Sequence, residues 1–273
     1  MRFKKYYPKR NLWSYKGQFG YVLIIAGSER YSGSPVFNGI AALRSGADLI
    51  TMVGPKRAMD IAACFLPDII TEPLNGELGL KHVPKILGLA RNFHSLIIGC
   101  GLNRSKETYQ AIRKLIKNID LPMIIDAEAI RAIAEQKDVV KNKKVIITPH
   151  TEEFRILTGE KLKPEVENRK EKVKRWADKL KTVILLKGHI DVISDGKKVA
   201  LNKTGSFFMT KGGFGDTLTG ICGALLARKV EPFEAAQTAA YINGRAGELA
   251  GKKYGEGVLA SDIFEFIPSV INQ

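Results

Sequence analysis

Residues 211–226 read KGGFGDTLTGICGALL, a glycine-rich loop followed by a run of small and apolar residues. The run predicts a helix that is apolar nearly all round and therefore buried. Gly212, Gly213 and Gly215 expose successive backbone N–H groups at its N-terminus, where the helix dipole also favours anions. This arrangement suits a phosphoryl group in transfer, and it places Asp216 where the carboxylate can accept a proton from a substrate hydroxyl. The alternative, Asp216 as an ordinary N-cap, would not need the glycines before it.

The chain upstream of this helix alternates short apolar runs with longer amphipathic ones. The short runs are continuous, as is typical of parallel strands that are buried on both faces. We expect strands at Tyr21–Ala26, Leu49–Val53, Leu96–Ile98, Met123–Ile125, Val145–Thr148 and Val183–Leu186. We expect helices near residues 35–45, 57–65, 81–92, 105–117, 128–137, 151–158 and 165–180. A hairpin is expected from Val192–Ser194 and Lys198–Leu201 around Asp195-Gly196, followed by a mostly helical tail.

This alternation predicts an α/β fold with a doubly wound, mostly parallel central sheet and helices on both faces. The sequence has no linker, low-complexity tract or internal repeat, so we expect one domain over residues 1–273. The chain has no apolar run of membrane-spanning length and no apolar segment of a secretory signal. Its cysteines, Cys64, Cys100 and Cys222, form no CxxC pair, which argues against a disulfide framework or structural zinc site. We therefore expect a soluble, cytoplasmic protein.

The net charge of +15 is unusual and invites a nucleic-acid interpretation. Most of it lies in two segments, a basic N-terminal arm over residues 1–16 and residues 161–181, which together hold +11. In the second segment a stripe of apolar residues recurs at helical spacing: Val173, Trp176, Ala177 and Leu180. The basic side chains then occupy a solvated helix face. Since no RRM, KH or zinc pattern is present either, a solvated face is favoured over a nucleic-acid site.

Polar or small residues follow several predicted strands, at the sheet edge where ligands bind in open α/β sheets. The segments are GSERYSGS at residues 27–34, GCG at 99–101, TPHTEE at 148–153 and LKGHID at 186–191. Each also has a structural interpretation. The first can be a tight turn with a capping serine, and Cys100 can be a small buried filler. His150 can be structural rather than part of a site, and Lys187 can be a turn lysine that reaches solvent.

The motif GGxGD at the start of a small-residue helix resembles the anion-hole and catalytic-base motif of ribokinase-like kinases. With GSERYSGS, GCGLN, DAEAI, TPHTEEF and KGHID in this order, the chain resembles the ATP- or ADP-dependent NAD(P)H-hydrate dehydratases, which repair hydrated nicotinamide cofactors. The likeness runs from about Lys16 to Pro268. The family usually carries an N-terminal epimerase domain as a fusion, for which this chain has no room. We therefore expect a stand-alone dehydratase.

The resemblance implies a role for each matching residue. Contacts to the hydrated nicotinamide substrate are implied for Ser34, Gly101, His150 and Asp216. Contacts to the adenine nucleotide are implied for Lys187, Gly188, His189, Ile190, Asp191, Gly212, Gly213, Phe214 and Gly215. Asp126 and Glu153 become candidates for organising a metal ion and phosphates. Three positions depart from the family pattern: Ser34 replaces a common alanine, Phe214 a threonine, and Asp191 the threonine of KGxxT. They put the nucleotide contacts in doubt more than the role of Asp216.

The resemblance also implies a reaction, in which the 6-hydroxyl of the S-epimer of hydrated NADH or NADPH is phosphorylated and phosphate is then eliminated. It implies ATP or ADP and a divalent cation such as Mg²⁺ as cofactors, with no nucleic-acid or membrane partner. A ribokinase-like kinase of a small hydroxylated metabolite, such as a thiamin precursor, is the alternative. The choice of nucleotide and the oligomeric state, including a homo-oligomer, are left open. An apolar C-terminal stretch could serve an interface or the core: Ile263, Phe264, Phe266, Ile267, Val270 and Ile271.

Overall fold

The computed structural model describes residues 3–273, so Met1 and Arg2 of the basic arm lie outside the described residues. The strands are β1 (Tyr21–Ile25), β2 (Leu49–Pro55), β3 (Ile70–Leu74), β4 (Ser95–Ile98), β5 (Met123–Ile125), β6 (Val145–Ile147), β7 (Val183–Leu186), β8 (Asp191–Ser194) and β9 (Val199–Asn202). The α-helices are α1 (Gly33–Arg44), α2 (Lys56–Phe65), α3 (Val83–Ala90), α4 (Lys106–Asn118), α5 (Glu128–Ala134), α6 (Thr151–Thr158), α7 (Val166–Leu180), α8 (Phe214–Ala227), α9 (Pro232–Tyr254) and α10 (Phe266–Asn272).

These strands form one sheet in the order β3-β2-β1-β4-β5-β6-β7-β8-β9. The pairs from β3 through β7 are parallel, whereas β8 pairs antiparallel with β7 and β9 antiparallel with β8. The strand order reverses direction between β1 and β4, the kind of switch point beside which open α/β sheets bind ligands. The expected doubly wound, mostly parallel sheet and its terminal hairpin are therefore confirmed.

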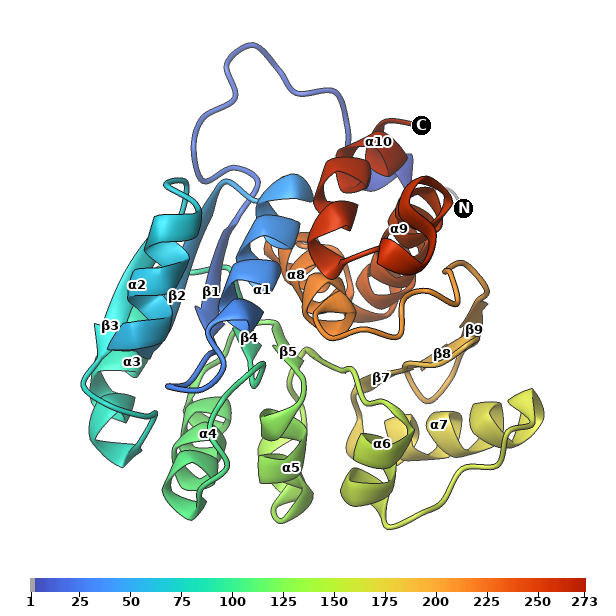
Figure 1. Ribbon diagram of the computed structural model, residues 1–273. Helices are drawn as coiled ribbons and strands as arrows, with labels where there is room; N and C mark the ends of the chain where they lie inside the picture. Colours follow the sequence, from blue (N-terminus) through green and yellow to red (C-terminus); the bar gives the residue numbers. More distant parts are fainter. Residues whose placement is uncertain (1–2) are drawn as a thin grey trace.

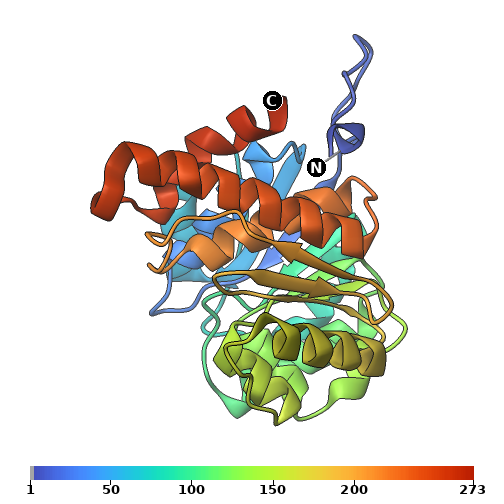
Figure 2. The ribbon, with the colours of Figure 1, turned by 90° about the vertical axis from the view of Figure 1, so that its right-hand side faces the viewer.

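Helices cover both faces of the sheet (Figure 1). One face packs against α1, α2, α8, α9 and α10, and the other against α3 to α7. Along β1, Val22 and Ile24 point to the first layer while Leu23 and Ile25 point to the second. Both sets are fully buried, which explains why the strands read as continuous apolar runs. Figure 2 shows α9 and α7 on opposite sides of β8 and β9.

Strand β3 was not expected from the sequence, because its residues do not form an apolar run. It lies at the edge of the sheet, contains Pro73, and only Leu74 is buried. A proline is tolerated on an edge strand because one side of that strand makes no ladder hydrogen bonds. The expected helix near residues 81–92 is also divided, into a 3₁₀ turn at Leu80–His82 and α3. The expected helix over residues 128–137 ends at Ala134.

The basic helix face expected over residues 165–180 is largely solvated. Helix α7 buries Val173, Trp176, Ala177 and Leu180, and most of its basic residues lie on the remaining positions, which solvent reaches. Arg169 is an exception, since it is partly buried and donates to the Lys187 backbone oxygen at 3.2 Å. In the arm, Phe3 is buried in the core, and the loop over residues 7–19 projects from the molecule (Figures 1 and 2). The C-terminal apolar stretch belongs to the core, with Phe266 and Ile271 at its border. Within residues 3–273, no helix combines the length and apolar character needed to cross a membrane.

Helix α1 packs directly on α8 at Gly220. A Cβ at this position would lie 2.3 Å from the backbone oxygen of Asn38 and 2.8 Å from Cβ of Ala41. We expect Gly220→Ala to push the helices apart and to lower the free energy of unfolding by about 1–3 kcal/mol. Gly88→Ala in α3 is the matched control, because a Cβ there meets no atom of the described chain within 4 Å. It should stabilise the protein by up to about 1 kcal/mol through helix propensity. Urea denaturation of both variants measures this, and equal stabilisation by both would contradict the close α1–α8 contact.

Candidate active site

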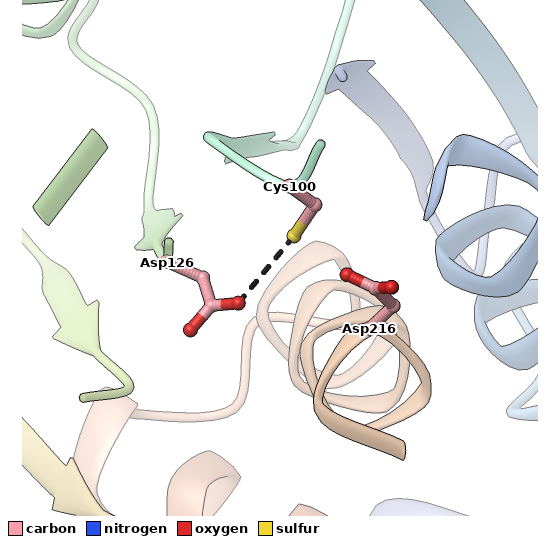
Figure 3. Close-up of side chains that lie close together, drawn as sticks. All are labelled: Cys100, Asp126 and Asp216. Atoms are coloured by element: carbon pink, nitrogen blue, oxygen red, sulfur yellow. Dashed lines mark hydrogen bonds between the residues drawn. The ribbon is translucent and has the colours of Figure 1, made fainter. Parts of the chain in front are cut away.

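The strand-end motifs converge at the carboxyl edge of the parallel strands. Cys100 follows β4, Asp126 follows β5, Thr148 follows β6 and Lys187 follows β7. Asp216 reaches the same place from the first turn of α8. Ligand atoms of Cys100, Asp126 and Asp216 all lie within 4.8 Å of one another (Figure 3). The parallel arrangement therefore brings together residues that are up to 116 positions apart in the chain.

A lysine held by two buried carboxylates forms the centre of this edge. Lys187 Nζ lies 2.8 Å from Asp126 Oδ1 and 3.9 Å from Glu153 Oε2. The hydroxyl of Thr148 donates a second hydrogen bond to Asp126 Oδ1, at 2.7 Å. Burial alone would lower the pKa of Lys187, but the two carboxylates outweigh it and raise the pKa above its ordinary value. Lys187 is therefore a fixed cation inside the site, and the interpretation as a turn lysine that reaches solvent is wrong.

The carboxylate of Asp216 lies beside this ion pair, close to Cys100 (Figure 3). Burial and the negative charge of Asp126 raise its pKa to about 7, while the polar groups of Ser34 and Cys100 oppose the shift. The Cys100 thiol also donates to Asp126 Oδ2, at 3.7 Å. Burial and the two aspartates raise the pKa of Cys100 well above its ordinary value, so it remains a neutral thiol. An aspartate that titrates near neutral pH is suited to accept a proton from a hydroxyl.

The glycines before Asp216 serve different purposes. Gly213 is the N-cap of α8 with φ +100°, and a Cβ there would lie 2.8 Å from Cβ of Ala260. Gly213 is therefore required by the fold. A Cβ on Gly212 would meet none of the described atoms within 4 Å, and one on Gly215 would meet only Lys187 Nζ, at 3.4 Å. These two positions leave open space next to first-turn amides that have no partner within the helix, as an anion site needs. Since the N-cap is Gly213, the N-cap interpretation of Asp216 is wrong.

A cavity of about 580 Å³ adjoins this loop. Of the nucleotide-binding residues expected from the sequence, six line it: Lys187, Gly188, His189, Asp191, Phe214 and Gly215. Ile190, Gly212 and Gly213 are not among its lining residues. Its far wall is the segment Lys203–Thr210 with residues of α9, which the sequence motifs did not indicate. The cavity is large enough to hold a nucleotide-sized ligand.

Asp191 stabilises the turn between β7 and β8. Its Oδ1 accepts a hydrogen bond from the Gly188 amide at 3.0 Å, and its Oδ2 accepts one from Asn202 Nδ2 at 2.9 Å. Burial raises the pKa of this carboxyl group. Both carboxylate oxygens of Asp191, which replaces the threonine of KGxxT, thus accept hydrogen bonds from the protein. Asp191 also lines the cavity.

Ser34 and Gly101 lie against each other on the other side of Asp216. Gly101 has φ +66°, and a Cβ there would lie 2.9 Å from the Ser34 hydroxyl oxygen. Because the Ser34 hydroxyl is close enough to the Asp216 carboxyl group to lower its pKa, both residues border Asp216. Ser34 and Gly101 therefore border Asp216, and neither residue lines the cavity, which borders it through Lys187 and Gly215.

His150 lies at the edge of the site and is the N-cap of α6. Its Nδ1 accepts hydrogen bonds from the amides of Glu152 at 3.1 Å and Glu153 at 3.3 Å. Glu153 returns the interaction, since its Oε2 accepts from the His150 amide at 2.9 Å. His150 thus has the structural role that the sequence left open, and about half of its side chain remains exposed.

Asn38 and Thr219 complete the surroundings of Asp216 and were missed by sequence reasoning. Asn38 Nδ2 donates to the Asp216 backbone oxygen at 2.9 Å and to Thr219 Oγ1 at 2.7 Å. The Thr219 hydroxyl donates to the same backbone oxygen at 2.7 Å. For Asn38, the one available signal was that a polar residue occupies a buried position of α1. Thr148 was inside a motif we singled out, but its contact with Asp126 depends on the neighbouring strand.

The oxygen ligands at Asp126 fit a hard divalent cation whose other ligands are phosphate oxygens. Asp126 Oδ1 is occupied by Lys187 and Thr148, which leaves Oδ2 facing Cys100 and Asp216. Glu153 is occupied by Lys187 and the His150 amide. Mg²⁺ commonly binds through one or two carboxylates together with substrate phosphates. Asp126 is therefore better placed than Glu153 to share such an ion with a phosphate at the glycine loop.

The sheet, its terminal hairpin and the glycine loop before Asp216 define a ribokinase-like α/β protein. The sequence model of the NAD(P)H-hydrate dehydratase family matches residues 22–269, so this chain belongs to that family. The fold agrees with that of the ADP/ATP-dependent NAD(P)H-hydrate dehydratase from Bacillus subtilis co-crystallized with ATP/Mg²⁺. The TM-score is 0.80 at 28% identity, over 97% of this chain and 94% of the other.

Two archaeal relatives are more similar in sequence. The bifunctional NAD(P)H-hydrate repair enzyme Nnr of Pyrobaculum aerophilum is 43% identical over 95% of this chain and 52% of its own length. The ADP-dependent (S)-NAD(P)H-hydrate dehydratase of Cenarchaeum symbiosum is 38% identical over 98% of this chain and 94% of its own. The chain thus spans about half the length of the bifunctional relatives and nearly all of the dehydratase.

The raised pKa of Asp216 makes stability depend on pH. Because the folded protein holds this proton more tightly than the unfolded chain, stability falls as pH rises from 3.8 to about 7 and the loss is complete above that. Asp216→Asn removes the loss. At pH of about 8 we expect the free energy of unfolding of the variant to exceed that of the parent by at least about 1 kcal/mol. At pH of about 4 the difference should vanish. Denaturation across this range measures it, and parallel stability curves would contradict a raised pKa.

Proposed function

We propose that this protein catalyses the nucleotide-dependent dehydration of the S-epimer of hydrated NADH and NADPH, as one domain over residues 1–273. The proposal is supported most directly by Asp216, a carboxylate of pKa about 7 at the N-terminus of α8, beside a fixed lysine and a nucleotide-sized cavity. It is supported further by membership of the family and by the names of the relatives, which include ADP-dependent dehydratases.

In the proposed mechanism, Asp216 accepts the proton of the 6-hydroxyl of the hydrate. The hydroxyl oxygen then attacks the terminal phosphoryl group of ADP or ATP, and AMP or ADP leaves. The first-turn amides beside Gly212 and Gly215 and the ammonium of Lys187 stabilise the charge on the phosphoryl oxygens. Asp126 would hold a Mg²⁺ ion, which would supply further stabilisation of negative charge on the phosphoryl oxygens. The phosphate ester then breaks as the ring nitrogen releases electrons, and loss of a proton from the neighbouring ring carbon restores the dihydronicotinamide.

The proposed roles follow from where the residues lie. Ser34 and Gly101 border the carboxylate of Asp216 and would contact the hydrated ring, with the exposed part of His150 at the edge. The nucleotide would occupy the cavity, with its terminal phosphate between Lys187 and the glycine loop. Gly188, His189 and Asp191 line the same cavity and would lie along the nucleotide.

The test supplies the S-epimer of hydrated NADH with Mg²⁺ and either ADP or ATP, and follows the absorbance of the reduced nicotinamide together with inorganic phosphate. We expect both to appear in equal amounts and only when nucleotide is present. A stable phosphorylated product from another alcohol, with no recovery of reduced nicotinamide, would instead favour a kinase of a small hydroxylated metabolite.

The role of Asp216 is tested with Asp216→Asn, which keeps the shape of the side chain but cannot accept the proton. We expect turnover to fall by at least about 100-fold, the usual contribution of a general base, while ADP binding measured by calorimetry stays within about threefold of the parent. The matched control is Asp195→Asn, in the distant β8–β9 turn, which should retain full turnover. Near-normal turnover in Asp216→Asn would contradict the assignment.

A further inference from the structure

An exposed arginine lies on the loop that borders Asp216. Arg104 comes three residues after Gly101, in the segment that connects β4 to α4. Gly101 lies against Ser34, and the Ser34 hydroxyl is close enough to Asp216 to affect its pKa. About two thirds of the Arg104 side chain is exposed. Arg104 thus lies on the loop that leads on from Gly101, and we call the surface formed by Tyr31, Ser34, Gly101 and Arg104 the rim. None of these four residues lines the cavity beside Gly215.

The guanidinium of Arg104 is held in place by a buried carboxylate. Arg104 Nε donates to Glu128 Oε1 at 2.7 Å, and the hydroxyl of Tyr109 donates to Glu128 Oε2 at 2.7 Å. Arg131 Nε lies 3.7 Å from the same Oε1. Two guanidinium groups thus share one carboxylate, so the cluster carries a net charge of +1. No group within residues 3–273 accepts a hydrogen bond from the terminal nitrogens of Arg104, which leaves them available to a ligand.

An aromatic ring lies beside this cluster. Tyr31 is half-exposed, and its Cβ would lie 3.2 Å from a Cβ at Gly101. A tight turn fixes it, because the Tyr31 amide donates to Ser28 Oγ and the Ser28 amide donates to the Tyr31 oxygen, each at 3.0 Å. The guanidinium of Arg30 lies 5.3 Å from the ring centroid. The rim therefore combines oriented positive charge with a fixed aromatic surface.

We propose that Arg104 binds the diphosphate of the hydrated dinucleotide, with Tyr31 packing against the nucleoside that extends beyond it. This inference rests on the proposed function, in which the hydrated ring lies at Asp216. The rest of the dinucleotide must then leave the site past the rim, because the cavity on the other side of Asp216 holds the phosphoryl donor. A preorganised guanidinium with free terminal nitrogens matches phosphate oxygens in charge and geometry.

The diphosphate is common to the NADH and NADPH hydrates, which differ only in the 2′-phosphate of the adenosine. Arg104 therefore recognises a dinucleotide without distinguishing the two. A substrate without phosphate gains nothing from it. This difference between substrates separates a role in binding from a general effect on the fold.

The experiment measures KM and kcat of the full chain for three compounds: hydrated NADH, hydrated NADPH and hydrated dihydronicotinamide riboside, which has no phosphate. In Arg104→Ala we expect KM for both dinucleotides to rise by about tenfold or more, because a charge-assisted contact is lost. We expect kcat, the KM for ADP and all constants for the riboside to remain at the parent values. Arg104→Lys, which keeps the charge without the planar fork, should recover part of the loss.

Arg113→Ala is the matched control, since Arg113 on α4 pairs with Glu135, the residue that follows α5, at the opposite end of α5 from Glu128. It should change none of these constants. An unchanged KM for hydrated NADH in Arg104→Ala, or an equal rise for the riboside, would overturn the proposal.

A readout without turnover separates this proposal from the proposed function. NADH carries the same diphosphate, and its fluorescence reports binding directly. If the parent protein turns over none of the hydrates, the proposed function is wrong. Weaker NADH binding in Arg104→Ala, but not in Arg113→Ala, would still support the diphosphate contact. Equal NADH affinity in the parent and in Arg104→Ala would overturn it.

Discussion

Lys187, Asp126 and Glu153 form a buried group of charges at the carboxyl edge of the sheet, and the other features of the site depend on it. A buried charge is tolerated only when it is paired and hydrogen-bonded, and each member of this group satisfies that condition. Asp126, paired with Lys187 and hydrogen-bonded by Thr148, places a negative charge beside Asp216. That charge, added to burial, moves the pKa of Asp216 toward neutrality. One ion pair thus provides both a fixed cation for phosphates and a base of suitable strength.

The fold supplies this arrangement because parallel strands end at the same edge. Asp126, Thr148 and Lys187 follow neighbouring strands β5, β6 and β7, so their side chains meet without any local sequence relationship. Helix α8 brings Asp216 to the same edge, and its close packing on α1 allows Asn38 to fix the Asp216 backbone. The two sides of Asp216 then differ. The cavity lies toward β7 to β9, and the rim with Arg104 lies toward β4 and α4.

The sequence predicted the parallel sheet because its strands are buried on both faces and therefore read as apolar runs. It did not predict β3, whose proline and polar residues are acceptable only at an edge. The glycine motif placed Asp216 in the first turn of a buried helix, as the structure has it. The sequence could not distinguish Gly213, required by its φ and by Ala260, from Gly212 and Gly215, which leave open space. The sequence could not predict contacts between elements, such as that of Asn38 with Asp216, because they depend on how two helices pack. The roles assigned to the individual site residues remain predictions.

The central claim is that the charge of Asp126 and burial together make Asp216 a base at neutral pH. It can be measured by following the carbon-13 resonance of the Asp216 carboxyl group across pH, with Asp216→Asn providing the assignment. The account predicts a midpoint of about 7, which falls when Asp126→Asn removes the neighbouring charge. A midpoint at the ordinary aspartate value of 3.8 would contradict it.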